Sequence, residues 1–478
     1  MQIKYKPLVY GISLIATLGG FLFGYDTAVI SGAVDSLNKF FVLPQGLPES
    51  LAHSLLGFIV SAALIGCIIG SASGGYFSQL LGRKKSLLLA AILFTISGIG
   101  SAIPELGLAP IGSGGHSLIL PFIIYRIMGG IGIGLASIIS PMYIAEVSPA
   151  AIRGRLVSWN QLAIVSGILA VYFVNYYISL QGDAVWNQFV GWRWMFASSA
   201  FPGALFFVVL WFIPESPRWL VMKGKESKAL HIFGLLNGKE KAEQTLASIR
   251  STIVKHSGKL LSFGFFVLAV GIMLSAFQQL VGIQVMMYYA PEIFKDMGQS
   301  SHSAMFQTIL VGSVNFIFTV VAIYSVDKFG RKPLLLIGSG FMFFFMLVLG
   351  LCFFTHALGV ISLICVLGFV GSFSFSWGPV TWVLLSEIFP NSIRSKAMSL
   401  TVAVQWITNY TVSSTFPLLD KNTWLVEHFN HSVSFWLFGV MSLLSFIFVW
   451  RMIPETKGKS LEQMEDVWRY KRQNAILK

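Results

Sequence analysis

Two ionisable residues lie deep inside long apolar stretches of this 478-residue sequence. Asp26 lies in FLFGYDTAVISG, and Arg126 lies in a separate apolar stretch one hundred residues later. Ionisable groups are costly in such surroundings and usually have a function there. A movement that makes or breaks a pair between Asp26 and Arg126 would change how readily the carboxylate binds a proton. The alternative is a permanently ionised pair with a structural role.

Carboxamide side chains also fall within the apolar stretches, at Gln161, Gln278, Gln279, Gln284, Asn315 and Gln405. A carboxamide donates and accepts hydrogen bonds without carrying a charge, so it could bind a neutral polar ligand. It could equally bond to a neighbouring helix, and both interpretations stay open at this level. One straight helical face cannot carry Gln278, Gln279 and Gln284 together. Gly282 therefore offers a place for local unwinding, and Pro291 offers another break.

Glutamate and arginine recur together at corresponding places in the two halves of the chain. YIAEVSPAAIRGR (143–155) and LLSEIFPNSIRSK (384–396) share Glu-x-x-Pro-x-x-x-Arg at a separation of 241 residues, and GRKK is echoed by GRKP. An isolated basic cluster is usually only an orientation signal. Recurrence in both halves instead indicates ion pairs between neighbouring helix ends, which must break if the halves separate there. The candidate gate residues are Arg83, Glu146, Arg153, Arg331, Glu387 and Arg394.

Membrane helices must position these residues, because the chain is 55% hydrophobic and 11% charged, whereas soluble proteins average about 45–50% and about 25%. A bilayer core about 30 Å thick needs roughly 20 apolar residues per helix. Lipid offers no partner for backbone N–H and C=O groups, so each span must be helical. Twelve apolar runs lie near 8–33, 54–79, 86–105, 118–145, 157–180, 194–213, 262–290, 303–326, 333–355, 358–388, 396–418 and 432–453. We therefore expect an all-α membrane protein.

One long polar segment separates six of these runs from the other six. We predict an N-terminal six-helix bundle over 1–213, a linker with short helices over 214–260, a C-terminal six-helix bundle over 261–453 and a tail over 454–478. PESPRWL follows the sixth run and PETKGKSL follows the twelfth, so the polar segments after the two bundles also correspond.

The net charge of +13 reports membrane topology rather than nucleic-acid binding, because 28 of the 33 lysines and arginines fall on one side of the predicted spans. This distribution predicts that both termini are cytoplasmic. Cys67, Cys352 and Cys365 lie within spans, so no disulfide framework is implied. The sequence contains no HExxH, GxSxG or Walker motif, so we expect no enzyme and neither a metal nor a cofactor.

The motifs GRKK, GRKP, PESPRWL, PETKGKSLEQ, QQLVGIQVMMYYAPEIF and WGPVTWVLLSEIFP resemble those of the sugar porter branch of the major facilitator superfamily. The resemblance covers nearly the whole chain, is strongest to bacterial xylose/proton symporters, and extends to animal glucose facilitators. It implies two six-helix bundles with short cytoplasmic helices, a bacterial inner-membrane location, and alternating access by rocking of the halves.

The same resemblance implies a monosaccharide substrate, bound by the six carboxamides with Trp382 and Trp406 over the apolar face of the sugar ring. It adds Phe23, Ile168, Tyr288, Phe373 and Gly378 to the predicted site, with Gly378 as a flexible point in the tenth span. Ile168 follows Gln161 by seven residues on the same helical face, and glucose facilitators resemble it there, whereas xylose relatives can carry glutamine. Gln284 stands where the family usually has asparagine, so the choice between pentose and hexose stays open.

Symporters of this family tend to carry an aspartate where Asp26 lies, and facilitators an asparagine, so the first hypothesis is proton-coupled import of D-xylose or D-glucose by a monomer. Ser199 stands where some proton-coupled relatives have a glutamate, which keeps a proton-independent uniporter as the alternative. A sugar sensor that does not transport is a third hypothesis. It would be expected to carry a long cytoplasmic tail, whereas only 27 residues follow Arg451.

Overall fold

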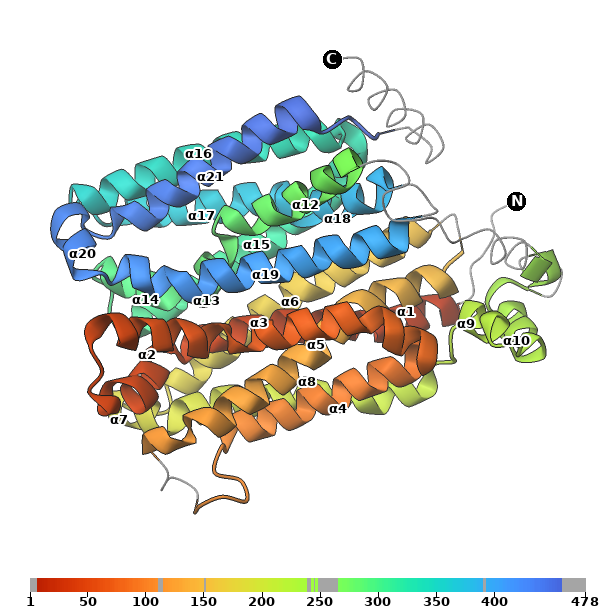
Figure 1. The fold of residues 1–478 in the computed structure, drawn as a ribbon, viewed down its shortest axis with the longest axis horizontal. Coiled ribbons are helices and arrows are strands. Elements are labelled where there is room, and N and C mark those ends of the chain that lie inside the picture. Colours follow the sequence, from red (N-terminus) through yellow and green to blue (C-terminus); the bar gives the residue numbers. More distant parts are fainter. Residues whose placement is uncertain are drawn as a thin grey trace.

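The computed structural model describes residues 7–110, 115–149, 152–238, 242–244, 246–247, 265–389 and 393–457. Every regular element in these ranges is a helix. The long helices run roughly parallel to one another (Figure 1), with α9 and α10 at one end, which we call the linker end. The opposite end, where α2, α7 and α20 lie, is called the far end.

The first half supplies six long helices, which run alternately away from and toward the linker end. They are α1 (Pro7–Val29), α3 (Glu49–Leu80), α4 (Arg83–Ala102), α5 (Ile119–Val147), α6 (Arg153–Ser179) and α8 (Trp192–Val209). Short elements connect them: η1 (Ile30–Gly32), α2 (Val34–Leu37), η2 (Asn38–Val42), η3 (Leu43–Gln45), η4 (Gly115–Leu118), α7 (Ala184–Trp186), η5 (Asn187–Gly191) and η6 (Leu210–Phe212). The linker begins with α9 (Pro217–Met222) and α10 (Glu226–Asn237).

The second half repeats this pattern with two of its membrane segments broken. Its helices are α12 (Phe265–Leu280), α13 (Ile283–Tyr288), α14 (Ala290–Asp296), α15 (Ser301–Phe329), α16 (Arg331–Phe354), α17 (Val360–Phe375), α18 (Trp377–Ile388), α19 (Arg394–Asp420), α20 (Thr423–Phe429) and α21 (Ser432–Met452). These bounds match the predicted apolar runs to within a few residues. The predicted domain limits stay predictions.

Among the described residues, eleven segments are long and apolar enough to cross a membrane. The remaining long helix, α19, is more polar because it carries Thr401, Gln405, Asn409 and Ser413, all of which are buried. Large apolar side chains on the outer surface are exposed instead, for example Phe201 at 75%. This inverted distribution is what a lipid environment demands, and it explains why one inner helix is less apolar than the others.

The seventh segment breaks at Gly282, as the spacing of its glutamines predicts. Gly282 adopts φ 89°, a left-handed conformation that glycine tolerates best, and α13 begins directly after it. A second interruption at Tyr289 precedes Pro291 in α14. The tenth segment breaks at Ser376, two residues before Gly378, which itself lies inside α18. The break therefore presents the backbone carbonyls around Trp377 to the neighbouring helices.

Polar contacts between the two halves, in the described part of the chain, lie from mid-helix to the far end. The Tyr172 hydroxyl donates to the backbone carbonyl of Met287 at 2.8 Å. Lys295 Nζ lies 2.9 Å from Asp35 Oδ2, and the Thr423 hydroxyl donates to a Glu49 carboxylate oxygen at 2.7 Å. The halves are thus held together at the far end.

Replacing Gly282 with alanine should destabilise the protein. A Cβ atom at this position would lie 2.5 Å from the Phe438 ring, and the left-handed backbone adds a cost of about 1–2 kcal/mol. We expect the melting temperature of Gly282→Ala to fall by several degrees in detergent. The control is Gly340→Ala in α16, where a Cβ meets nothing within 4 Å, so its melting temperature should hold or rise. Equal melting temperatures for the two variants would contradict the expected strain.

Candidate functional site

Gln278, near the end of α12, is the central residue of a buried group of carboxamides. Its Nε2 donates to the backbone carbonyls of Trp377 (3.2 Å) and Gly378 (3.4 Å), which lie at the start of α18. Its Oε1 accepts hydrogen bonds from Gln405 Nε2 in α19 and from Gln279 Nε2 at 3.4 Å. One side chain therefore ties α12 to α18 and α19 at the middle of the second half.

This group keeps unused hydrogen-bonding capacity. Gln279 Oε1, Gln405 Oε1 and Trp406 Nε1 are buried, and none has a protein hydrogen-bond partner among the described residues. Buried polar atoms in native proteins nearly always have partners, so each such atom needs an explanation. Two acceptors and one donor in the same neighbourhood suit a ligand that both donates and accepts, as a polyol does.

Aromatic rings close the group toward the first half. Trp406 in α19 lies 5.2 Å, between ring centroids, from Phe23 in α1. Phe373 lies beside Gly378, where a Cβ would be 3.5 Å from its ring. Trp382 is half-buried in α18. The Phe23–Trp406 contact therefore lies where the two halves meet, as expected for a site that both halves share.

Asn315 and Tyr288 are held by a second set of contacts around α13. Asn315 Oδ1 accepts from the Ser374 hydroxyl at 2.8 Å, and its Nδ2 lies 3.8 Å from Met287 Sδ. The Tyr288 hydroxyl accepts from Asn409 Nδ2 at 3.4 Å. The short helix α13, isolated by the breaks on either side, thus depends on α15, α17 and α19 for its position.

Asp26 and Arg126 form the ion pair that the sequence suggested. Arg126 Nη1 donates to Asp26 Oδ1 at 2.8 Å, and both side chains are 2% exposed. Asp26 Oδ2 and Arg126 Nε have no protein partner in the described residues, and the guanidinium lies 5.1 Å from the centre of the Phe196 ring. A single hydrogen bond in apolar surroundings leaves the pair free to part when its charge changes.

Ser199 takes no part in this pair. Its hydroxyl donates to the carbonyl of Phe196 at 2.7 Å, and the residue faces α4, where a Cβ at Gly98 would lie 2.6 Å from the Ser199 hydroxyl. The neighbouring Ser198 instead contacts the Tyr25 hydroxyl at 2.9 Å. Position 199 therefore supplies no ionisable side chain to the Asp26–Arg126 pair.

A small cavity of about 10 Å³ connects the ion pair to the second half. Thr27, Cys67 and Arg126 line it from the first half, and Tyr288 lines it from α13. This volume is about that of one water-sized probe. Arg126 of the ion pair and Tyr288 of the broken helix therefore line the same cavity.

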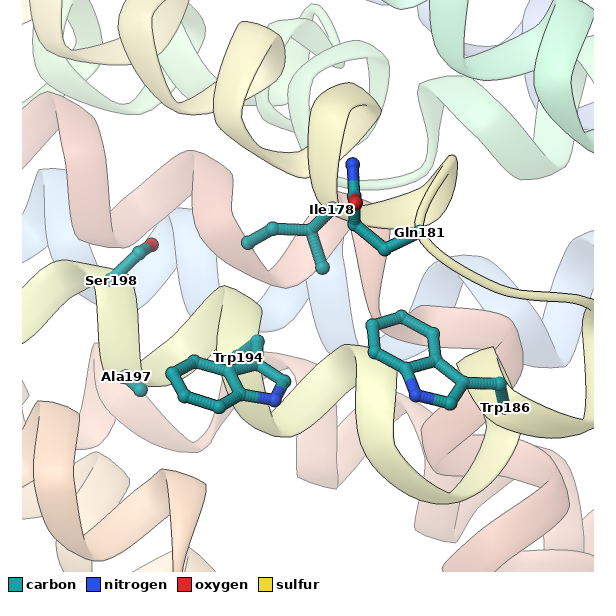
Figure 2. A pocket seen from close by; sticks show the side chains of 6 residues that line it. All are labelled: Ile178, Gln181, Trp186, Trp194, Ala197 and Ser198. Carbon is teal, nitrogen blue, oxygen red and sulfur yellow. The ribbon is translucent and has the colours of Figure 1, made fainter.

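A larger cavity of about 340 Å³ lies away from all the predicted site residues. Figure 2 shows the rings of Trp186 and Trp194 and the side chain of Ile178 pointing toward it. These residues belong to the far-end parts of α6, α7 and α8. Tryptophans gather where membrane proteins meet the lipid–water boundary, and no sequence motif indicated this cavity.

The charged residues at the linker end form the same arrangement in both halves. Arg83 Nη2 lies 2.7 Å from Glu146 Oε1, and Arg331 Nη2 lies 2.9 Å from Glu387 Oε1. The Ser216 hydroxyl donates to Glu146, and the Thr456 hydroxyl donates to Glu387 at 2.6 Å. Each glutamate is therefore bound within its own half.

Arg153 does not pair with Glu146 in this arrangement. Arg153 is half-buried, and its Nε has no partner in the described residues. The side chain of Arg394 lies outside what the structure describes. The two glutamates of the repeated motif thus form ion pairs, and their partners here are the arginines of GRKK and GRKP.

Two further glutamates, whose role the sequence did not reveal, cap helices at the linker end. Glu215 accepts from the backbone N–H groups of Arg83 (2.9 Å) and Lys84 (3.2 Å) at the start of α4. Glu455 accepts from those of Arg331 (3.1 Å) and Lys332 (3.0 Å) at the start of α16. The sequence feature that could have revealed these two glutamates is the Pro-Glu pair, which is repeated after a separation of 240 residues.

The two caps differ in electrostatics. Burial raises the pKa of Glu215 and outweighs the N–H donors of Ser216, Lys84 and Arg83. Burial also acts on Glu455, but the N–H donors of Lys457 and its neighbours prevail and lower the pKa of that carboxyl. Ionised Glu455 therefore stabilises the fold, whereas ionised Glu215 carries a cost of burial.

Residues 12–468 match the family described as "Sugar (and other) transporter". The chain is 54% identical over 471 residues to the D-xylose-proton symporter of Escherichia coli (strain K12), with 96% of each chain covered. This protein belongs to the sugar transporter family. Another family member, the glucose facilitated diffusion protein of Zymomonas mobilis, is 41% identical over 468 residues, covering 97% of this chain and 98% of that protein.

Two solved structures of the xylose transporter XylE resemble this sugar transporter closely. The inward open conformation has a TM-score of 0.87 at 52% identity, covering 96% of this chain and 100% of that chain. XylE bound to 6-bromo-6-deoxy-D-glucose has a TM-score of 0.85 at 54% identity, covering 97% and 99%. The predicted family and the all-helical major facilitator fold are confirmed.

The sequence-predicted site residues fall into two sets in this family member. Gln278, Gln279 and Gln405 lie in one hydrogen-bonded group, with Trp406 among the buried residues around it. Gln161 and Gln284 are half-buried, and in the described part of the chain no hydrogen bond joins them to that group. Ile168 is buried in α6. Their roles toward a ligand stay predictions.

We expect Glu455→Gln to lower the melting temperature at pH 7, because ionised Glu455 stabilises the start of α16. A charge at a helix N-terminus contributes about 1 kcal/mol, which corresponds to about 2 °C. The pKa of Glu455 is lowered in the folded state, so the stability that its charge contributes is lost as the pH falls through that pKa. The difference in melting temperature between Glu455→Gln and wild type should therefore shrink in acid.

Glu215→Gln is the matched control for that measurement. The pKa of Glu215 is raised in the folded state, so the stability that this residue contributes is present at low pH and is lost as the pH rises through that pKa. The glutamine variant should therefore keep or exceed the wild-type melting temperature at pH 7. Equal losses in the two variants would refute the electrostatic difference between the caps.

Proposed function

We propose that this protein is a secondary transporter that imports a monosaccharide together with a proton, by alternating access, across a bacterial inner membrane. The observation that carries the sugar assignment is the Gln278 group, in which two carboxamide oxygens and an indole N–H are buried without protein partners. Sugar hydroxyls donate and accept, so they would satisfy all three atoms. The 54% identity to the D-xylose-proton symporter supports the same substrate class.

The orientation follows from charge. The linker end carries Arg83, Lys84, Arg331 and Lys332 at the starts of α4 and α16, and positive residues mark the cytoplasmic side. The linker end and both termini are therefore cytoplasmic, and the far end faces outward. Because the Gln278 group and the Asp26–Arg126 pair come from one chain, a monomer suffices for transport.

The contacts between the halves support an inward-facing conformation. The Asp35–Lys295 and Glu49–Thr423 contacts close the external side, and Tyr172 holds Met287 beside the broken helix α13. Import requires these contacts to break when the sugar enters from outside. The linker-end networks, which lie within each half here, would then exchange partners, with Arg153 available to a glutamate of the other half.

Coupling to protons is assigned to Asp26. Protonation removes the charge that holds Arg126, and the freed guanidinium lies at a cavity wall shared with Tyr288. Tyr288 belongs to α13, between the two breaks that make this segment movable. A change of charge in the first half can thus reach the helix that closes over the sugar.

The substrate is proposed to be D-xylose or D-glucose. Ile168 presents an apolar contact, which suits the extra CH₂OH of a hexose, and the relative from Zymomonas mobilis is a glucose facilitated diffusion protein. The same relative and Ser199 favour the second candidate, a uniporter with this sugar site and no coupling. The two candidates differ only in the role of Asp26.

Truncation of the sugar site tests the substrate assignment. Gln278→Ala and Trp382→Ala should each weaken binding of D-xylose or D-glucose about tenfold or more. The first variant loses buried hydrogen bonds, at a cost of about 1–3 kcal/mol, and the second loses the aromatic face proposed to pack on the sugar ring. Isothermal titration calorimetry on purified protein measures this loss. Gln181→Ala, an exposed carboxamide at the far end of α6, is the control and should bind as wild type. Unchanged sugar affinity in both site variants would show that Gln278 and Trp382 serve helix packing and not sugar binding.

Proton coupling is tested with Asp26→Asn in proteoliposomes. Wild-type protein should accumulate labelled sugar under an inward proton gradient, whereas the variant should lose accumulation and retain sugar exchange at equal concentrations on both sides. The reason is that asparagine cannot take up a proton at this site. Accumulation by the variant, or wild-type uptake that ignores the gradient, would favour the uniporter instead.

A further inference from the structure

Three side chains with metal-binding atoms meet at the far end of the second half, outside the sugar and proton sites. Asp296 ends α14, Asp420 ends α19, and His431 immediately precedes α21. One ligand atom from each lies within 4.8 Å of the other two. Asp296 is exposed, the His431 side chain is partly exposed, and the Asp420 side chain is only 4% exposed.

The two more buried members are poorly satisfied by the protein. His431 Nδ1 lies 3.5 Å from Asp420 Oδ1, yet this nitrogen is buried and makes no hydrogen bond. Among the described residues, the Asp420 carboxylate contacts His431 in an ion pair at 3.5 Å, which is longer than a conventional hydrogen bond. A buried carboxylate in this condition is costly unless a cation compensates it. The cation is either the imidazolium of His431 or a metal ion bound between the two groups.

The spacing also fits a bound ion. Zinc binds histidine nitrogen and carboxylate oxygen at about 2.0–2.2 Å in tetrahedral sites, which places neighbouring ligand atoms about 3.4 Å apart. The observed 3.5 Å between His431 Nδ1 and Asp420 Oδ1 is close to that value. Asp296, at the surface end of α14, needs only a side-chain adjustment to supply the third ligand, and water could complete the coordination.

Neighbouring charges act in both directions. Lys421 and Glu292 are the other charged groups that act on Asp296. Lys421 opposes a cation, but it lies 3.7 Å from Glu292, which also binds Lys295 at 3.2 Å. The lysine charges are thus partly neutralised, and two carboxylates remain to bind a divalent ion.

We propose that Asp296, Asp420 and His431 form a binding site for a divalent cation of the zinc class. The bound ion would join α14 to the ends of α19 and α21. Helix α14 also carries Lys295, which reaches Asp35 in the first half. Occupancy of this site would therefore stiffen the segment that closes the far end, without touching the sugar site.

The test uses the purified full-length protein, stripped with EDTA and titrated with zinc chloride at neutral pH. We expect saturable binding of one ion by calorimetry and a rise of several degrees in melting temperature. His431→Asn and Asp296→Asn should each weaken zinc binding by at least about tenfold, the scale found when metal-site residues are lost. Magnesium should bind far more weakly, because it prefers all-oxygen ligands.

The control variants are Glu427→Gln and His428→Asn, an exposed acid and histidine on the neighbouring helix α20, which should bind zinc as wild type does. Asp296 is at the surface, so its variant should fold normally. Saturable zinc binding that is the same in wild type and in both site variants would overturn the proposal, as would no saturable binding by the wild type up to millimolar zinc. In the latter case, the His431 imidazolium alone compensates Asp420.

Discussion

The whole structure depends on one constraint: a polar group inside an apolar helix must find a partner within the protein, because lipid provides none. Gln278 meets this demand by bonding to two backbone carbonyls at the start of α18 and to two other carboxamides. Asp26 and Arg126 meet it by pairing with each other. In both places the partnership is incomplete, and the unused atoms are where we propose that ligand and proton chemistry take place.

The two halves have the same contacts at the linker end but differ in the features of their interior. Each half binds one glutamate through an arginine and a hydroxyl, and each caps a long helix with a second glutamate. Among the described residues, the Asp26–Arg126 pair lies in the first half, whereas the helices broken at Gly282 and Ser376 lie in the second half. The duplicated halves can thus move as equivalent bodies, although the first half holds the buried ion pair and the second half holds the broken helices.

Communication between these functions needs elements that both halves touch. The small cavity walled by Arg126 and Tyr288 is one such element, and the contact of Tyr172 with Met287 is another. Both involve α13, whose short length and flanking breaks let it move without deforming the bundle. The helix proposed to cover the sugar site is therefore also the one that the ion pair and the far-end contacts can influence.

The sequence by itself determined the spans, the duplication and the break at Gly282, because apolar length, repeat spacing and helical periodicity are properties of a local segment. It also identified Asp26, Arg126 and the central glutamines, since a polar residue in an apolar stretch stands out without a structure. Only the tertiary structure decided that Glu146 binds Arg83, that the tenth segment breaks at Ser376, and that Asp296, Asp420 and His431 meet. Those facts depend on packing between helices far apart in the chain, and periodicity within one helix carries no information about which neighbour it faces.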